Sequence, residues 1–165
     1  MTIRTFAIVL AGALPLAAQT KISGTINCAK PDPMHQVDVG DRPGHVMMLS
    51  KVKCEWSKPI EMEGLKSKSG ESTQSDDASA KNSRGNGYHM GIMDNGDKYF
   101  VRYQGSAVLK DGQTEGADGK WSFTNGTGKL RGLKGGGTYK GKATSDGGMT
   151  FEIEGEYSVA PAAKK

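Results

Sequence analysis

The sequence predicts an all-β protein with a single antiparallel barrel of eight strands, and three observations lead to this prediction. Short segments alternate between apolar and polar residues with the period of a half-buried strand. Asn-Gly and Asp-Gly dipeptides, which tolerate the positive φ angles of hairpin turns, recur through the second half of the chain. No segment after residue 18 shows a helical period. Eight strands can close into a barrel that has no free edge.

The first eighteen of the 165 residues have the pattern of a secretory signal peptide. Arg4 gives a charged start, residues 5–16 are apolar except for a few small or polar ones, and Ala17 and Ala18 precede Gln19. The apolar run is too short for a membrane span. We therefore expect export to the periplasm or the cell exterior, a barrel domain over residues 19–159 and a flexible tail over 160–165.

Charge and cysteines restrict the partners. Removal of Arg4 lowers the formal charge from +4 to about +3. Lysines and arginines are spread over every segment, without the basic face interleaved with aromatics that nucleic acid requires, so we expect no nucleic-acid partner. In an oxidising compartment, the two cysteines, Cys28 and Cys54, predict a disulfide.

The alternative for the two cysteines is a metal pair. His35, His45 and His89 are far apart and show none of the usual ligand spacings, so we expect neither a metal nor another cofactor. His45 and His89 are each predicted to be surface or rim residues. Residues 19–28 form a first strand whose more apolar face includes Cys28, and residues 45–56 form a second with Cys54 on its more apolar face, as a cross-strand bridge requires.

The segments that flank the second strand have other patterns. Residues 29–44 hold three prolines and two glycines, which predict a connection without a strand, long enough to fold over one mouth of the barrel and to place His35, Asp38 and Asp41 near it. Residues 59–65 read as a short third strand. Residues 66–87 hold six serines among charged residues and no large apolar one, which predicts a mobile surface loop.

From Tyr88 the chain reads as a regular meander. The five remaining strands are predicted over residues 88–94, 97–109, 120–124, 138–144 and 149–158. Turns are predicted at Asn86-Gly87, Asn95-Gly96, Asp111-Gly112, Asp118-Gly119, Asn125-Gly126 and Asp146-Gly147. Met90 and Ile92 are expected to face the row Tyr99, Val101 and Tyr103.

Glycines crowd the stretch from residue 126 to 137, where a closed sheet needs tight bends and close backbone approach. A phosphate-binding loop is the alternative. The residue after Gly128-Lys129 is Leu130 instead of Ser or Thr, and Gly135-Gly136-Gly137 disfavours the helix that such a loop needs. The stretch is therefore interpreted as a structural corner.

The segment Gly126 to Gly135, Gly-Thr-Gly-Lys-Leu-Arg-Gly-Leu-Lys-Gly, resembles the GGTGxFxGxxG segment of the allene oxide cyclase and dirigent-like barrel families and of related bacterial proteins. Asn125 stands where the first glycine of that pattern usually lies. The resemblance covers about the last third of the chain. It implies a calycin-like, eight-stranded antiparallel barrel and carries over no activity, because the acidic residues of the two plant families have no counterpart that can be placed here.

Six aromatic residues are the candidate ligand-binding set. Tyr and Trp combine an apolar body with a hydrogen-bonding tip, which suits a small aromatic or lipid-like ligand inside a barrel. The alternative is that they fill the core, since an eight-stranded barrel has little more room than its own side chains need. The set is Trp56, Tyr88, Tyr99, Tyr103, Trp121 and Tyr139.

Two functions follow as hypotheses. The first is an exported, non-enzymatic barrel that binds a small apolar or aromatic ligand or has a structural role in the envelope. The second is an isomerase or cyclase, or dirigent-like steering of a reactive apolar substrate. An enzyme needs titratable groups that converge inside the barrel. Few lie on the predicted inward faces and no G-x-S-x-G elbow is present, so no catalytic residue is assigned and the first hypothesis is favoured. The oligomeric state is left open.

Overall fold

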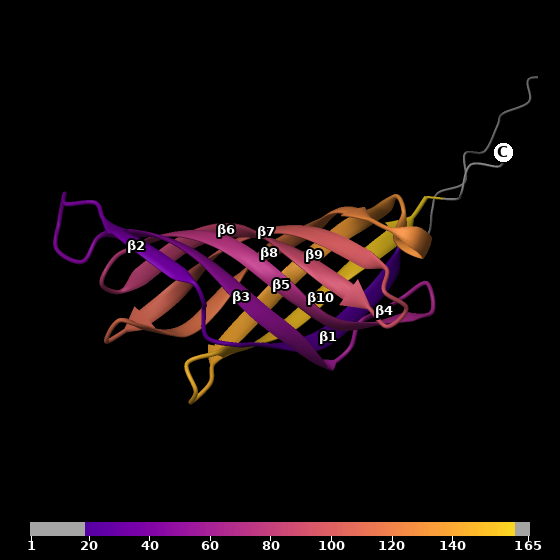
Figure 1. Cartoon of the computed structure of the whole chain (residues 1–165), viewed down its shortest axis with the longest axis horizontal. Coiled ribbons are helices and arrows are strands. Elements are labelled where there is room, and N and C mark those ends of the chain that lie inside the picture. The colour runs from indigo at the N-terminus through magenta and orange to yellow at the C-terminus, as the bar shows by residue number, and fades with distance from the viewer. Residues whose placement is uncertain (1–18, 161–165) are drawn as a thin grey trace, which may run out of the picture.

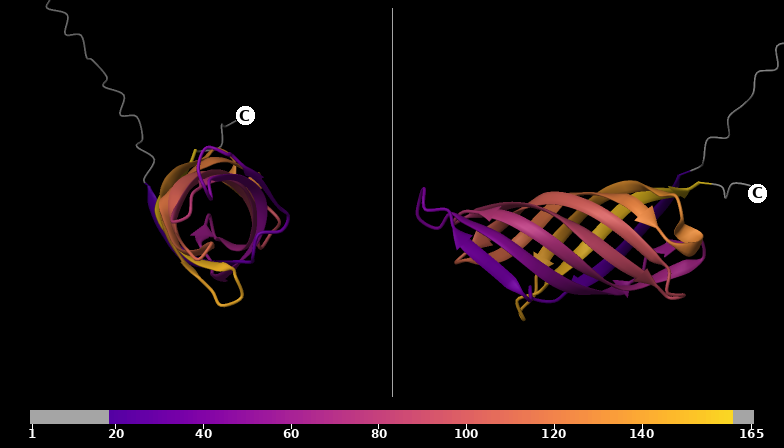
Figure 2. Two further views of the ribbon diagram at one scale, coloured as in Figure 1. Left: turned by 90° about the vertical axis from the view of Figure 1, so that its left-hand side faces the viewer. Right: turned by 45° about the horizontal axis from the view of Figure 1, so that its top comes forward.

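The computed structural model describes residues 19–160 and forms a closed antiparallel barrel (Figures 1 and 2). The predicted signal peptide and most of the predicted tail lie outside the described residues. Seen along its axis, the barrel is a ring of strands (Figure 2, left). Its eight strands are β1 (Thr20–Cys28), β3 (Val46–Lys58), β5 (Leu65–Ala78), β6 (Asn82–Met93), β7 (Lys98–Lys110), β8 (Gln113–Gly126), β9 (Leu133–Ala143) and β10 (Met149–Val159).

These eight barrel strands pair in the order β1, β3, β5, β6, β7, β8, β9, β10, and β10 pairs with β1. The predicted all-β class and the eight-stranded antiparallel barrel are therefore confirmed. Two short strands, β2 (Met34–Asp38) and β4 (Glu61–Met62), lie at opposite ends of the barrel (Figure 1). A 3-10 turn, η1 (Gly128–Leu130), follows β8.

The seam between β1 and β3 closes the barrel and is its shortest pairing. Only four register pairs join the two strands, and a bulge interrupts them. The last pair is Cys28 with Cys54, whose α-carbons are 4.0 Å apart and whose side chains form the predicted disulfide. Beyond Cys54, toward its start, β3 pairs with β2 instead of β1.

The serine-rich segment 66–87 was predicted to be a mobile loop, and it is instead strand. It forms nearly all of β5 and the first half of β6. On β5, Ser72, Gln74 and Asp76 point into the barrel, where part-exposed positions accept polar side chains. The backbone of β5 pairs with β3 on one side and with β6 on the other, and these two ladders hold a strand that could not bury enough apolar surface alone.

The strand predicted over 59–65 is not one of the eight barrel strands. The serine-rich β5, which was predicted to be a loop, takes that place in the barrel. Only Glu61 and Met62 form a bridge strand there, and the turn folds inward so that Ile60 and Met62 are buried. The connection 29–44 was predicted to hold no strand, yet β2 forms between its prolines. β2 lies at the edge, paired only with β3, where the prolines cost few hydrogen bonds.

Two predicted details of the meander are also corrected. Met90 and Ile92 do not face the row of Tyr99, Val101 and Tyr103, because that row is in register with Gly91, His89 and Gly87. Asn86-Gly87 and Asp118-Gly119 lie inside β6 and β8 instead of at turns. Their glycines serve close side-chain approach inside the barrel.

The predicted glycine corner turns the chain between β8 and β9. Gly128, Gly132 and Gly135 have φ angles of +53°, +80° and +128°, which favour glycine. The turn drives Leu130 into the core with no exposed surface, and it packs there with Met62, Met93 and Tyr99. The end of the barrel at β4 is therefore closed by apolar side chains.

Candidate functional site

The barrel interior has two halves of different chemistry. The half nearer β4 holds the main core, with Tyr99, Trp121 and Phe123 packed together and each at most 8% exposed. Beyond this core the inward side chains become polar or small and are part-exposed, including Gln74, Asp76, Tyr103 and Tyr139. Solvent thus reaches inward-pointing groups in this second half, which we call the polar half.

Large inward side chains of the polar half lie over glycines of neighbouring strands. Tyr103 covers its register partner Gly87, where an ideal β-carbon would lie 2.5 Å from the phenol oxygen. The Tyr139 hydroxyl reaches across Gly119 and meets Gly105. Because these three positions lack β-carbons, the ends of the two tyrosine side chains lie close against the inner wall.

Gly85 on β6, Gly105 on β7 and Gly119 on β8 are register partners and form a row across the sheet, which we call the glycine row. Asp76 approaches this row from the side opposite Tyr139. Its carboxylate lies against Gly85, its register partner on β6, and Gly85 is in register with Gly105 on β7. The Asp76 carboxylate and the Tyr139 hydroxyl therefore lie over adjacent glycines of one row and face each other across the inner wall.

A chain of hydrogen bonds positions the carboxylate. The Tyr103 hydroxyl donates to Gln74 Oε1 at 3.1 Å, and Gln74 Nε2 donates to Asp76 Oδ2 at 3.0 Å. Within residues 19–160, no side chain or backbone group donates a hydrogen bond to Asp76 Oδ1. One carboxylate oxygen is thus held by the protein and the other is left to solvent.

Deeper in the barrel, His89 packs against the core. Its Nδ1 is 2.9 Å from the Ser72 hydroxyl, and its ring centroid is 5.9 Å from that of Tyr99. Nε2 is buried without a hydrogen-bond partner among the described residues and lies against Gly70. Burial lowers the pKa of His89 to about 4, so the imidazole is neutral at neutral pH. The prediction of a surface or rim histidine is wrong here, because inward parity on β6 belongs to the odd-numbered residues.

Burial dominates the electrostatics of the polar half. It raises the pKa of Asp76 against the smaller opposing effect of the Gln74 hydrogen bond. It also raises the pKa of Tyr103, and it raises the pKa of Tyr139 to about 12, with smaller contributions from the charges of Asp118 and Asp76. Both tyrosines are therefore hydrogen-bond donors at any ordinary pH.

The negative charge of Asp76 has no internal counterpart. Every lysine and arginine between residues 19 and 160 is exposed, and none of them forms an ion pair with Asp76. His89, the nearest inward titratable nitrogen base, is neutral at neutral pH. A partly buried carboxylate without a cation is costly, so Asp76 is a candidate functional group.

The structure brings together five of the six predicted aromatic residues and excludes the sixth. Trp56 donates from Nε1 to the Tyr99 hydroxyl at 3.1 Å, and Trp121 donates from Nε1 to the Thr138 carbonyl at 3.1 Å. Tyr99 and Trp121 belong to the packed core and Trp56 lies at its border, as the core-filling alternative expects. Tyr103 and Tyr139 reach the polar half. Tyr88 points outward and is 60% exposed.

Sequence reasoning missed Ser72, Gln74, Asp76 and His89. Composition gave no signal for the first three, since their segment is as polar as a loop. A pairing signal existed for two of them, because Gln74 and Asp76 have the glycines Gly87 and Gly85 as their register partners on β6. Ser72 and His89 are partners of each other and carried no such signal.

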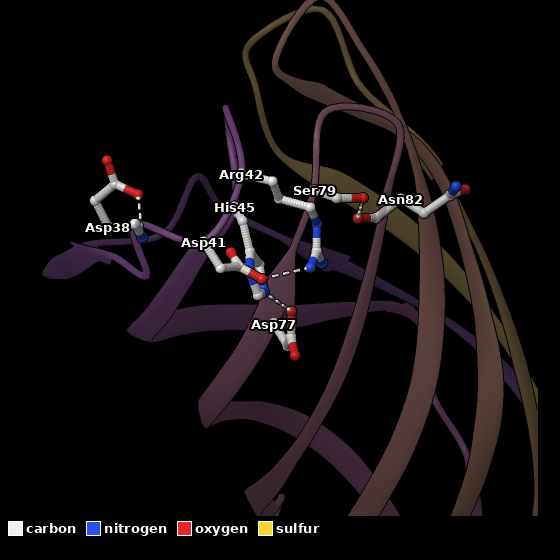
Figure 3. Close-up of polar contacts among 8 residues, drawn as sticks. Asp38, Asp41, Arg42, His45, Asp77, Ser79 and Asn82 are labelled. Atoms are coloured by element: carbon white, nitrogen blue, oxygen red, sulfur yellow. Dashed lines mark hydrogen bonds and ion pairs between the residues drawn. The ribbon is translucent and has the colours of Figure 1, made fainter.

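A second polar cluster fastens the loop between β2 and β3 (Figure 3). His45 lies between two carboxylates, with Nδ1 bonded to Asp41 and Nε2 2.9 Å from Asp77 Oδ1 on β5. Arg42 adds an ion pair to Asp41 at 2.7 Å. The hydrogen bonds from Asp41 and then Asp77 raise the pKa of His45. His45 is only 8% exposed, so it is not a surface residue, but together with Asp41 it lies at one end of the barrel, as the rim prediction expects.

The outer wall carries a shallow groove behind the glycine row. It has a volume of about 440 Å³, its floor is Gly85, Gly105 and Gly119, and exposed side chains such as Asp118 and Lys120 line it. Within the described residues no group of three or more His, Cys, Asp or Glu side chains is placed to hold a metal ion. Nor does this part of the chain contain a helix long and apolar enough to cross a membrane.

Comparisons with known proteins support the fold. No family model matches this sequence, and no curated protein sequence matches it. A protein of unknown function from the DUF3224 family of Shewanella oneidensis MR-1 has a similar structure, with a TM-score of 0.54 and 17% identity over 88% of this chain and 100% of that one. This likeness extends to the fold alone.

Two further solved structures are more distant. One is a pyocyanin demethylase, with a TM-score of 0.43 and 14% identity over 81% of this chain and 98% of that one. The other is a pterocarpan synthase dirigent protein, with a TM-score of 0.46 and 11% identity over 95% of this chain and 100% of that one. The barrel that the glycine-rich resemblance implied is confirmed, and membership of an allene oxide cyclase-like family is not.

Proposed function

We propose that this protein binds a small organic ligand, with an aromatic or apolar body and a hydrogen-bonding group, in the polar half of the barrel, and that it does so without chemical turnover. One observation carries the proposal: the interior is packed and apolar at the β4 end, but its other half presents inward tyrosines and a carboxylate that remain part-exposed. Polar groups that solvent reaches inside a rigid wall are the arrangement of a ligand site.

The same residues explain why an apolar or aromatic body fits. Tyr103 and Tyr139 pack edge to face, with centroids 6.2 Å apart and ring planes at 88°. Tyr139 packs in the same way against Phe151, at 5.7 Å and 81°. Edge-to-face pairs leave ring faces that a flat or branched apolar group can contact. The hydroxyl of Tyr139 makes no hydrogen bond within residues 19–160 and is a donor for the ligand.

The site in this proposal operates outside the cytoplasm. The disulfide between Cys28 and Cys54 and the signal-like pattern of residues 1–18 both support export to the periplasm or the cell exterior. A purely structural envelope role remains the alternative in which the polar half stays empty. Titration with a small phenolic ligand separates these two roles.

A second candidate function, isomerase or cyclase chemistry, is favoured by one observation. Asp76 and His89 both lie inside the barrel, whereas the sequence predicted few inward titratable groups. A carboxylate whose pKa is raised by burial can accept and return a proton at one carbon of an apolar substrate. Turnover of a bound candidate substrate that Asp76→Asn abolishes would favour this function over simple binding.

The test of binding is a titration of the mature protein with 4-propylphenol, followed by two-dimensional amide NMR. We expect shifts at inward positions of β5, β7 and β9. Ala107→Trp places a large side chain inside the polar half and should abolish binding, whereas Ser106→Trp, which points outward from the next position, should not. Shifts confined to the outer wall, or retained in Ala107→Trp, would contradict the proposal.

A further inference from the structure

We infer that the ligand of the polar half is an organic cation, an ammonium or guanidinium group carried on an aromatic or apolar body, and that Asp76 is its counter-ion. The inference rests on the proposed function and names the chemical class of its ligand.

Asp76 is the one acidic side chain of β5 that points into the barrel. Every lysine and arginine within residues 19–160 is exposed. The carboxylate is desolvated enough to raise its pKa, with only the amide of Gln74 to offset the cost. A partly desolvated carboxylate gains from pairing with an opposite charge, and a bound cation would supply the missing partner.

Gln74 occupies Oδ2 of Asp76, and Gln74 is itself held by the Tyr103 hydroxyl, so the carboxylate has a fixed orientation. Oδ1 lies against Gly85 and receives no donor from the described part of the chain. An N–H group of a ligand can therefore donate to Oδ1 without displacing any protein hydrogen bond.

Tyr103 and Tyr139 lie beside Asp76 with their ring planes at 88° to each other. The charge of Asp76 contributes to the raised pKa of both hydroxyls. The negative faces of tyrosine rings attract cations, and a carboxylate beside them strengthens this attraction in a partly desolvated site. An inorganic cation is a poorer fit, because a metal ion needs several oxygen or nitrogen ligands and the described residues place no such group here.

The test compares tyramine with 4-propylphenol, which has the same phenol body and a methyl group where tyramine carries its ammonium. Because the methyl group is the more hydrophobic of the two, a preference for tyramine can arise only from recognition of the charge. Isothermal titration of the mature protein should give an affinity at least about tenfold higher for tyramine, corresponding to about 1.4 kcal/mol.

Two isosteric variants locate the source of any preference. Asp76→Asn should bring tyramine to the affinity of 4-propylphenol or below. Asp118→Asn removes the same charge from the outer groove behind the glycine row and should leave the preference intact. Thermal unfolding of both variants confirms that each is folded before it is titrated.

A pH series of the wild type provides a measurement that needs no variant. Tyr103 and Tyr139 stay protonated throughout, because burial raises the pKa of each, and Asp118 lies on the outer face. His89 also stays neutral at pH values well above 4, because burial lowers its pKa to about 4. Acidification within that range begins to protonate Asp76, whose pKa burial raises, and should therefore weaken tyramine and leave 4-propylphenol unchanged.

The outcomes separate the two proposals. Equal affinities, binding of 4-propylphenol alone, or a tyramine preference that survives in Asp76→Asn would overturn the cation inference and leave the proposed function standing. A preference lost in Asp118→Asn would place the cation in the outer groove and also overturn it. Failure of both compounds to bind would contradict the inference and the proposed function together.

Discussion

The phenol ring of Tyr103 lies over Gly87, its register partner on β6, so closely that an ideal β-carbon on Gly87 would be 2.5 Å from both Cζ and the hydroxyl oxygen. The contact sets the direction of the Tyr103 side chain and thereby the hydrogen bond from its hydroxyl to Gln74. Gly87 is thus a positioning residue for the polar half.

Gly87→Ala should destabilise the fold by about 1–3 kcal/mol, because the added methyl group must push the Tyr103 ring away from the wall. Asn86→Ala, at the adjacent exposed position, is the control and should change stability by less than about 0.5 kcal/mol. Urea unfolding curves measure both. Equal stability of the two variants would mean that the ring moves aside freely.

Asp76→Asn should stabilise the protein at neutral pH. Burial raises the pKa of Asp76 in the folded state, so the folded protein binds this proton more tightly than the unfolded chain, and stability falls as pH rises from about the unfolded value of 3.8 through the raised one. The uncharged variant escapes this loss. We expect a gain of about 0.5–2 kcal/mol at neutral pH, shrinking to nothing below pH 3.8.

Unfolding free energies of the wild type and Asp76→Asn across this pH range would show whether the gain has the expected sign. A variant that is less stable than the wild type at neutral pH would show that the ionised carboxylate is already well compensated in the unliganded protein.

His89 should give the protein an acid-sensitive core. Burial lowers its pKa from 6.5 to about 4, so the stability that depends on the neutral ring is fully present above pH 6.5 and is lost as pH falls toward 4. The loss is roughly 3 kcal/mol for one histidine. Melting temperatures of His89→Phe should fall less steeply over this interval. Parallel acid limbs in the two proteins would assign the acid sensitivity to other groups.

His45 should act in the opposite direction. Asp41 and Asp77 raise its pKa above 6.5, so the stabilisation it provides is fully present below pH 6.5 and is lost as pH rises through the raised value. His45→Gln removes the charge. Amide exchange in the 39–45 loop should then be faster than in the wild type at low pH, and the difference should shrink at high pH. A pH-independent difference would show that His45 holds the loop by shape alone.

Loss of the disulfide should open the short β1–β3 seam. Its bridge closes a separation of 26 residues, so Cys28→Ser with Cys54→Ser should cost about 3 to 4 kcal/mol by freeing the unfolded chain. Thermal unfolding of the double variant and of the reduced wild type should agree. Thiol labelling of the unreduced protein should find neither cysteine free; two labelled thiols would contradict the bridge.

The class of fold was predictable from local patterns in the chain. Period-two alternation in 19–28 and 45–56 placed β1 and β3 and put Cys28 and Cys54 on facing sides, because a strand's side-chain parity is a local property. The corner glycines were also readable, since a positive φ excludes most other residues. These features depend on neighbours in the chain.

Which polar residues point inward depends on strand pairing that no local pattern predicts. Segment 66–87 has the composition of a loop, and it becomes a strand because β3 and β6 satisfy its backbone on both sides. The parity of β6 likewise placed His89 inside and Met90 outside, against the hydrophobic pattern, because the glycines that face Tyr99 and Tyr103 share the side of His89. Closure of the barrel then set Asp76 beside Tyr139, 63 positions apart in the sequence but joined by a row of register partners across four strand pairings. Pairing between distant strands is a property of the closed sheet, and no local pattern contains it.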